Sequence, residues 1–155
     1  MKNPTKIEQT SDREVTVTRT FDGPAAIVFD AWTKPELLKR WWAPKSYKMV
    51  MLACEVDARV GGAYRFTMSH EGKPPMDFFG KYLEVTPGKR LVWTNDENGA
   101  DAASTTTVTF EENNGQTTVV LREQHPTKEA FEANRGAEQG LPEQYTQLDE
   151  LLLAS

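Results

Sequence analysis

Alternating apolar and polar residues predict a strand near the start of the chain. In residues 14–21, Val15 and Val17 alternate with threonines, and β-branched side chains dominate. This two-residue period is typical of a half-buried β-strand. Residues 1–12 are polar and show no periodicity, so we expect a flexible N-terminal arm there.

Two short helices are predicted after this first strand. Pro24 is suited to a first helical turn, and apolar side chains recur at helical spacing in residues 25–32. Thr33 and Glu36 have the spacing of a capping box, and residues 37–42 again repeat apolar side chains at helical spacing.

Six strand-like segments follow, so we expect seven strands in all. Glycine, proline and asparagine separate them, and these residues suit the tight turns of hairpins. Strands in series joined by short turns predict an antiparallel meander. The segments cover residues 48–58, 63–70, 76–85, 90–95, 104–111 and 117–125.

The last segment, residues 127–155, predicts a long helix. Its apolar stripe includes Leu141, Tyr145, Leu148 and Leu151. Pro142 cannot continue an intact hydrogen-bond ladder without a kink or a restart, so we expect two helical halves with a joint near residues 139–142. A curved sheet needs its concave face covered, and this helix is the available cover. The expected class is α+β, as a single domain over residues 1–155, because no repeat or linker divides the chain.

Composition and charge narrow the possible partners. The chain has 155 residues, 38% hydrophobic and 26% charged, which is ordinary for a soluble globular protein. A net charge of −5 argues against nucleic acid or an anionic membrane as partner. Without an apolar run that could span a membrane or a signal region, we expect a cytoplasmic protein. Cys54 is the one cysteine and there are two histidines, so we expect no disulfide, metal or cofactor.

Four segments resemble a known family: RTFDGPAAIVFDAWTKPELLKRWWAP at 19–44, VGGAYRF at 60–66, GKYLEVTP at 80–87 and RLVWT at 90–94. They are similar to the small single-domain homologues of the activator of the 90-kDa heat-shock-protein ATPase, in the START-like (SRPBCC) superfamily of polyketide cyclases and lipid-transport relatives. The resemblance implies a helix-grip fold, with the C-terminal helix packed in the concavity of the sheet. Members often carry a Gly-Trp pair in the final helix, where this chain has Gly140 and Leu141.

The resemblance also implies a cavity between sheet and helix. By strand parity, Tyr64, Phe66 and Met68 share an inward face. An apolar cavity with a few polar groups would bind a small hydrophobic or amphipathic molecule, whereas a filled core is the alternative for the same pattern. The expected ligand-binding residues are Trp41, Tyr64, Phe66, Met68, Phe79, Tyr82, Trp93, Phe110, Tyr145 and Leu148.

Three residues could exchange protons on inward faces, namely Glu123, His125 and His70. Glu123 and His125 lie at a strand end beside Pro126, where side chains usually reach solvent, so we assign no catalytic residue. We therefore expect non-enzymatic binding by a monomer or homodimer. The alternatives are a chaperone- or stress-related protein-interaction module and a cyclase- or hydrolase-like enzyme.

Overall fold

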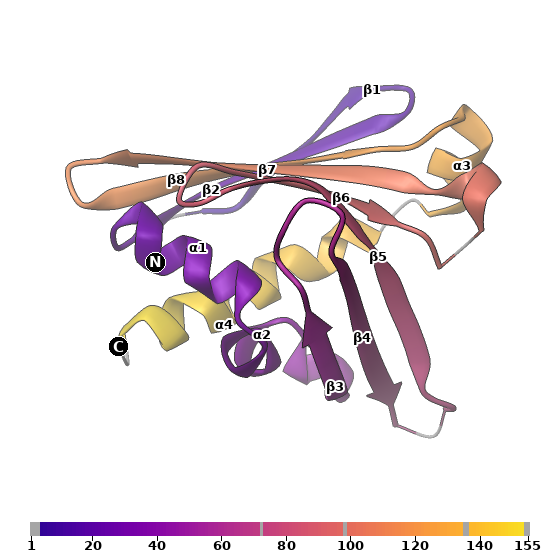
Figure 1. The fold of residues 1–155 in the computed structure, drawn as a ribbon, viewed down its shortest axis with the longest axis horizontal. Helices are drawn as coiled ribbons and strands as arrows, with labels where there is room; N and C mark the ends of the chain where they lie inside the picture. Colours follow the sequence, from indigo (N-terminus) through magenta and orange to yellow (C-terminus); the bar gives the residue numbers. More distant parts are fainter. Residues whose placement is uncertain (1–3, 72, 98, 135–136, 154–155) are drawn as a thin grey trace.

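The computed structural model describes residues 4–71, 73–97, 99–134 and 137–153 (Figure 1). These residues form an eight-stranded antiparallel sheet in the order β1-β2-β8-β7-β6-β5-β4-β3. Its strands are β1 (Lys6–Ser11), β2 (Glu14–Asp22), β3 (Met49–Val56), β4 (Ala63–His70), β5 (Met76–Thr86), β6 (Arg90–Asn95), β7 (Ser104–Asn113) and β8 (Gln116–Gln124).

The helical elements lie mainly on the concave side of the sheet, with α4 beneath the strands and α1 and α2 beside it (Figure 1). They are the α-helices α1 (Ala25–Thr33), α2 (Pro35–Trp41), α3 (Lys128–Ala133) and α4 (Leu141–Leu153), and the 3₁₀ turns η1 (Lys45–Tyr47), η2 (Ala100–Ala102) and η3 (Ala137–Gly140). No helix in the described ranges is long and apolar enough to cross a membrane.

The expectation of seven strands was wrong, because β1 forms within the segment predicted as a flexible arm. β1 pairs with β2 at the edge of the sheet, with Ile7 opposite Val17. Ile7 is the one residue of β1 that is not exposed, so the strand has no alternating apolar pattern. The hydroxyls of Thr10 and Thr16 instead share a hydrogen bond of 2.9 Å across the hairpin.

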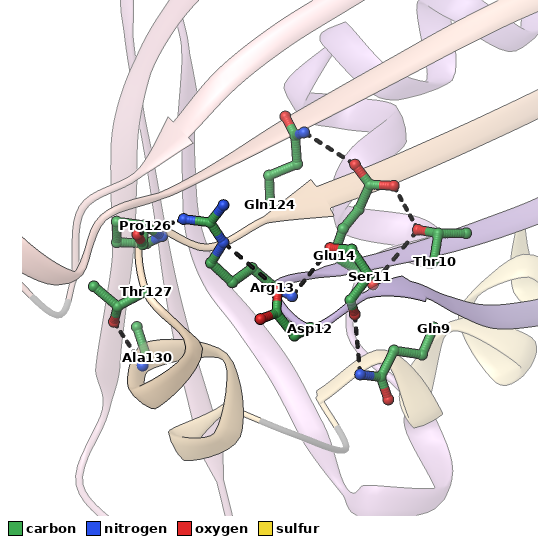
Figure 2. A network of polar contacts seen from close by, with 10 residues as sticks. All are labelled: Gln9, Thr10, Ser11, Asp12, Arg13, Glu14, Gln124, Pro126, Thr127 and Ala130. Carbon is green, nitrogen blue, oxygen red and sulfur yellow. Dashed lines mark hydrogen bonds and ion pairs between the residues drawn. The ribbon is translucent and has the colours of Figure 1, made fainter.

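A polar network fastens this hairpin to the end of β8 (Figure 2). The amide of Gln124 donates to the carboxylate of Glu14 at 2.9 Å, and the guanidinium of Arg13 donates to the carbonyl of Pro126 at 3.4 Å. Just beyond, the side chain of Thr127 accepts a hydrogen bond within the first turn of α3. The edge strand is therefore positioned largely by polar contacts, which hydrophobic periodicity does not reveal.

The C-terminal region is divided near residues 139–142, as expected, but into separate helical elements rather than the two halves of one long kinked helix. It consists of α3, the turn η3 and α4, and parts of the expected range, residues 135, 136, 154 and 155, lie outside the described residues. Pro142 lies in the first turn of α4, where a missing N–H removes no helical hydrogen bond. The proline thus suits a helix start better than a kink. The two short helices follow β2, which is the second strand.

Polar side chains, among them Gln147 and Asp149, attach α4 to the rest of the fold. The amide of Gln147 donates to the carbonyls of Trp41 at 2.9 Å and Ala43 at 3.0 Å, and its oxygen accepts from the backbone N–H of Lys45 at 2.9 Å. Arg19, which is 5% exposed, forms an ion pair with Asp149. Together these contacts hold α4 against the C-terminal end of α2 and against β2.

Candidate functional site

A cavity of about 230 Å³ lies between the concave face of the sheet and the helices α1, α2 and α4. Fifteen residues from eight elements and their ends line it, and most of them are aromatic or aliphatic. They are Trp32, Leu38, Trp42, Tyr64, Phe66, Met68, Phe78, Tyr82, Trp93, Asn95, Thr106, Leu121, Glu123, Leu141 and Gln144.

The register of the sheet explains why these side chains meet. Tyr82 of β5 lies opposite Trp93 of β6, Trp93 lies opposite Thr106 of β7, and Thr106 lies opposite Glu123 of β8. Residues directly opposite on neighbouring strands point to the same face. Four strands therefore each contribute one side chain to a single row across the sheet, and that row forms part of the cavity lining.

Aromatic rings form the wall of the cavity. Trp42 packs edge-on against Phe66 with ring centroids 5.5 Å apart, and Phe66 lies 5.1 Å from Tyr64. Trp32 packs 5.9 Å from Trp42 and 6.2 Å from Trp93. Among the described residues, the indole N–H of Trp32 has no hydrogen-bond partner, and it is buried away from accessible surface.

Asn95 is the centre of a polar cluster in the lining. Its side-chain oxygen accepts hydrogen bonds from the Tyr64 hydroxyl at 3.0 Å and from the Trp93 indole at 3.2 Å. Its amide nitrogen donates to the hydroxyls of Ser104 at 3.0 Å and Thr106 at 2.8 Å. Both ends of the amide are thus occupied, so the cluster is internally satisfied and orders the surrounding rings.

A carboxylate and a histidine lie next to this cluster. His125 Nε2 is 2.9 Å from Glu123 Oε1, and the imidazole packs edge-on against Phe131. His125 is 8% exposed, which corrects the expectation that this strand end reaches solvent. Glu123 lines the cavity, and among the described residues its Oε2 has no hydrogen-bond partner. A polar group therefore faces an otherwise apolar space.

Further carboxylates lie close to this end of the cavity. Burial raises the pKa of Glu97, and the negative charges of Glu123 and Asp96 raise it further. Burial likewise raises the pKa of Tyr64, to which Glu97 and Glu123 also contribute. The phenol of Tyr64 consequently stays protonated at neutral pH and can donate its hydrogen bonds to Asn95 and the carbonyl of Thr94.

Half of the expected ligand-binding residues line the cavity, namely Tyr64, Phe66, Met68, Tyr82 and Trp93. Four of the others, Trp41, Phe110, Tyr145 and Leu148, are buried in the core but are not part of the lining. Tyr145, for example, packs edge-on against Phe21 with centroids 5.1 Å apart. These four fill the space beside the cavity.

Phe79 is not part of the cavity lining. The guanidinium of Arg65 instead lies over its ring, 4.8 Å from the ring centroid. Its neighbour Phe78 occupies the lining instead. The inward position of Tyr82 predicts this result, since Phe78 lies four residues before it and shares its face of the strand. The parity signal was therefore available in the sequence.

The lining also contains residues that sequence reasoning did not assign to a ligand. Parity places Leu121 and Glu123 on the inward face, and it likewise places Asn95 with Trp93 and Thr106 with Val108, so a signal for these residues was available in the sequence. The remaining unassigned residues come mainly from the helices and could not be oriented without the fold; they are Trp32, Leu38, Trp42, Leu141 and Gln144. His70 is half-buried on β4 and does not line the cavity.

Metal ligands and a reactive thiol are two further kinds of candidate site. Within the described parts of the chain, no group of three His, Cys, Asp or Glu side chains could hold a metal ion. Burial raises the pKa of Cys54 to about 11. The side chain is therefore a thiol rather than a thiolate at neutral pH, which suits packing better than reactivity.

Comparisons with known proteins agree with the fold. The family model described as Activator of Hsp90 ATPase homolog 1-like protein matches residues 22–153. A search of curated proteins found no significant match. The chain is similar to a solved protein from Nitrosomonas europaea, with 26% identity, coverage of 92% of this chain and 96% of that chain, and a TM-score of 0.82.

Two other solved structures share the fold at lower identity. A protein from Rhodobacter sphaeroides is 21% identical, with coverage of 97% of this chain and 98% of that chain and a TM-score of 0.86. An AHSA1-like protein from Aeromonas hydrophila is 23% identical, with coverage of 89% and 94% and a TM-score of 0.72. The similarity thus extends over nearly the whole of each chain.

Proposed function

We propose that this chain, which belongs to the Activator of Hsp90 ATPase homolog 1-like family, binds a small amphipathic molecule. Small members of this family have the START-like fold. The binding site is the cavity between the sheet and α4. The observation that carries the proposal is a partly open cavity of about 230 Å³ between the sheet and the helices, lined mainly by apolar side chains. The proposed role is binding rather than catalysis.

The composition of the lining supports an amphipathic ligand. Aromatic and aliphatic side chains supply most of the surface, whereas Asn95, Thr106, Glu123 and Gln144 supply polar groups. Such a lining is typical of small-molecule sites, in which apolar burial provides affinity and a few polar groups fix orientation. The volume is below the roughly 300–1,000 Å³ of many ligand sites, so we expect a compact molecule of one or two rings.

Native mass spectrometry of the gently purified protein tests the proposal directly. A retained small molecule should add to the native mass and disappear on denaturation. As a second test, a fluorescent apolar probe is titrated against wild type and Leu121→Phe. This substitution replaces the leucine side chain in the cavity lining with a larger aromatic ring. The control is Arg122→Gln, an exposed neighbour on the same strand. Equal probe binding by all three proteins, together with a bare native mass, would refute the proposal.

A catalytic role is a second candidate, and the contact between Glu123 and His125 is the observation that favours it. A carboxylate facing an apolar cavity could act as a general base, with the imidazole orienting it. A panel of esters and cyclisable polyketones tests this activity. Turnover by wild type that is lost in Glu123→Gln would support catalysis, and unchanged turnover in the Glu123→Gln, His125→Asn and His70→Asn variants would exclude this role for them.

A chaperone-related interaction is the third candidate, and it rests on the family match alone. Pull-down of a purified 90-kDa heat-shock protein by this chain, with stimulation of its ATPase, would support this role. Recovery of no chaperone at physiological salt would count against it. A cytoplasmic location remains a prediction that cell fractionation can check.

A further inference from the structure

Charge is distributed one-sidedly around the cavity. Of the fifteen lining residues, Glu123 is the one that carries a formal charge at neutral pH, and no lysine or arginine is among them. Asp96 and Glu97 lie close enough to act electrostatically on the same region. The field inside the cavity is therefore negative and favours a cationic guest.

Several hydrogen-bond donors in the lining are already committed to protein acceptors. The amide of Asn95 donates to Ser104 and Thr106, and the indole of Trp93 donates to Asn95. The indole N–H of Trp32 has no partner among the described residues, but it is a neutral donor. A bound carboxylate or phosphate would find no lysine or arginine in the lining, so the desolvation of its charge would be compensated poorly.

Acceptor capacity is available by contrast. The hydrogen bond to His125 uses Oε1 of Glu123, and Oε2 is without a partner among the described residues. His125 Nδ1 is buried and has no partner in that part of the chain. Glu123 therefore has a carboxylate oxygen available to accept a hydrogen bond from a bound ammonium group.

The aromatic wall adds a second source of attraction for a cation. Ring faces carry negative potential, and ammonium groups bind over them, most strongly over tryptophan. Trp42 and Phe66 lie 5.5 Å apart, and Tyr82 and Trp93 lie 6.4 Å apart. These rings and the carboxylate of Glu123 on β8 belong to one lining, which suits an ammonium group.

We infer that the ligand of this cavity is a compact aromatic or alicyclic amine, bound in its protonated form with the ammonium group at Glu123. The rings of the ligand occupy the apolar part of the cavity beside Phe66 and Met68. The inference rests on the proposed binding function and adds the chemical class of the ligand. It also predicts that fatty acids and other anionic amphiphiles are rejected.

Isothermal titration calorimetry at neutral pH with three matched indoles tests this inference. Tryptamine, tryptophol and indolepropionate share one ring system and differ in bearing an amine, a hydroxyl or a carboxylate. We expect wild type to bind tryptamine about tenfold or more tighter than indolepropionate. Glu123→Gln should remove this preference while tryptophol binding changes less than about twofold. Glu111→Gln, the same change at an exposed position of β7, should behave as wild type.

The outcomes separate this inference from the function on which it rests. Binding of all three indoles with equal affinity, or tightest binding of indolepropionate, would overturn the amine assignment and leave cavity binding intact. Retention of the tryptamine preference in Glu123→Gln would also overturn it. Binding of none of them, with no shift of the Trp93 indole resonance in NMR spectra, overturns the amine assignment. If the apolar probe is also not bound, the proposed function fails with it.

Discussion

The most demanding test of the fold concerns the attachment of α4 through Gln147. We consider Gln147→Leu, which keeps a side chain of similar size and removes all three hydrogen bonds. The carbonyls of Trp41 and Ala43, both buried residues, then lose a donor, and the N–H of Lys45 loses an acceptor. Lys45 is exposed, so water can replace the lost bond there.

The cost follows from the two carbonyls. A buried polar group left without a partner costs about 1–3 kcal/mol, so the variant should lose about 2–5 kcal/mol of unfolding free energy after partial relaxation. With a urea slope of about 2 kcal/mol per M, the unfolding midpoint should fall by about 1–2.5 M. Such a loss is a large fraction of the roughly 5–15 kcal/mol that stabilises a typical domain.

Urea titration followed by tryptophan fluorescence and by circular dichroism measures this loss. Thr146→Ala is the matched control, because Thr146 is the exposed neighbour of Gln147 on α4, and its stability should change by less than about 0.5 kcal/mol. Gln147→Glu keeps an acceptor but points a carboxylate at two carbonyls, so it should be at least as unstable as Gln147→Leu. If Gln147→Leu unfolds within about 0.5 kcal/mol of wild type, the reasoning is refuted.

Three further predictions follow from other contacts. Asp149→Ala leaves the buried guanidinium of Arg19 without its ion-pair partner. Since Asp149 is partly exposed, we expect the free energy of unfolding, measured by chemical denaturation, to fall by about 1–3 kcal/mol. A loss no larger than that of a surface substitution would contradict this prediction. Gly80→Ala would place a methyl group 1.9 Å from the carbonyl oxygen of Thr94, so the thermal midpoint should fall by about 5 °C or more; an unchanged midpoint would show that the strands can separate freely. Cys54 should react slowly with iodoacetamide at neutral pH and faster as the pH approaches about 11. Because folding raises this pKa from 9.0 to about 11, the folded state holds the proton more tightly. The contribution of the thiol to stability is therefore present below pH 9 and is lost as the pH rises towards about 11. A rate of alkylation that does not change with pH would contradict the shift.

Hydrophobic periodicity predicted most of the sheet, because strands with one buried face must alternate. It did not predict β1, since the hairpin depends on contacts such as Thr10 with Thr16 and on a single apolar residue, Ile7. It indicated a joint at Pro142 but not whether the proline kinks one helix or starts another, because a proline can do either. The distinction depends on where the preceding turn ends.

The candidate site was only partly predictable for a different reason. Inward parity is the same for a residue that lines a cavity and for one that fills the core, so Tyr64 and Phe110 could not be distinguished. Asn95 shares the inward parity of Trp93, but its hydrogen-bonding role depends on register with Ser104 and Thr106, which the sequence does not show. Cavities arise from the balance of volumes contributed by many segments, and no single segment records that balance.

One consequence of the helix attachment concerns time rather than affinity. Leu141 and Gln144 form part of the cavity wall, and both belong to α4, the helix fastened by Gln147 and by the Arg19–Asp149 ion pair. We expect a guest that contacts this wall to leave faster when α4 is attached less firmly. Its residence time therefore reports the strength of a distant attachment, and Gln147→Leu should shorten the occupancy of a bound molecule without altering a single atom that touches it.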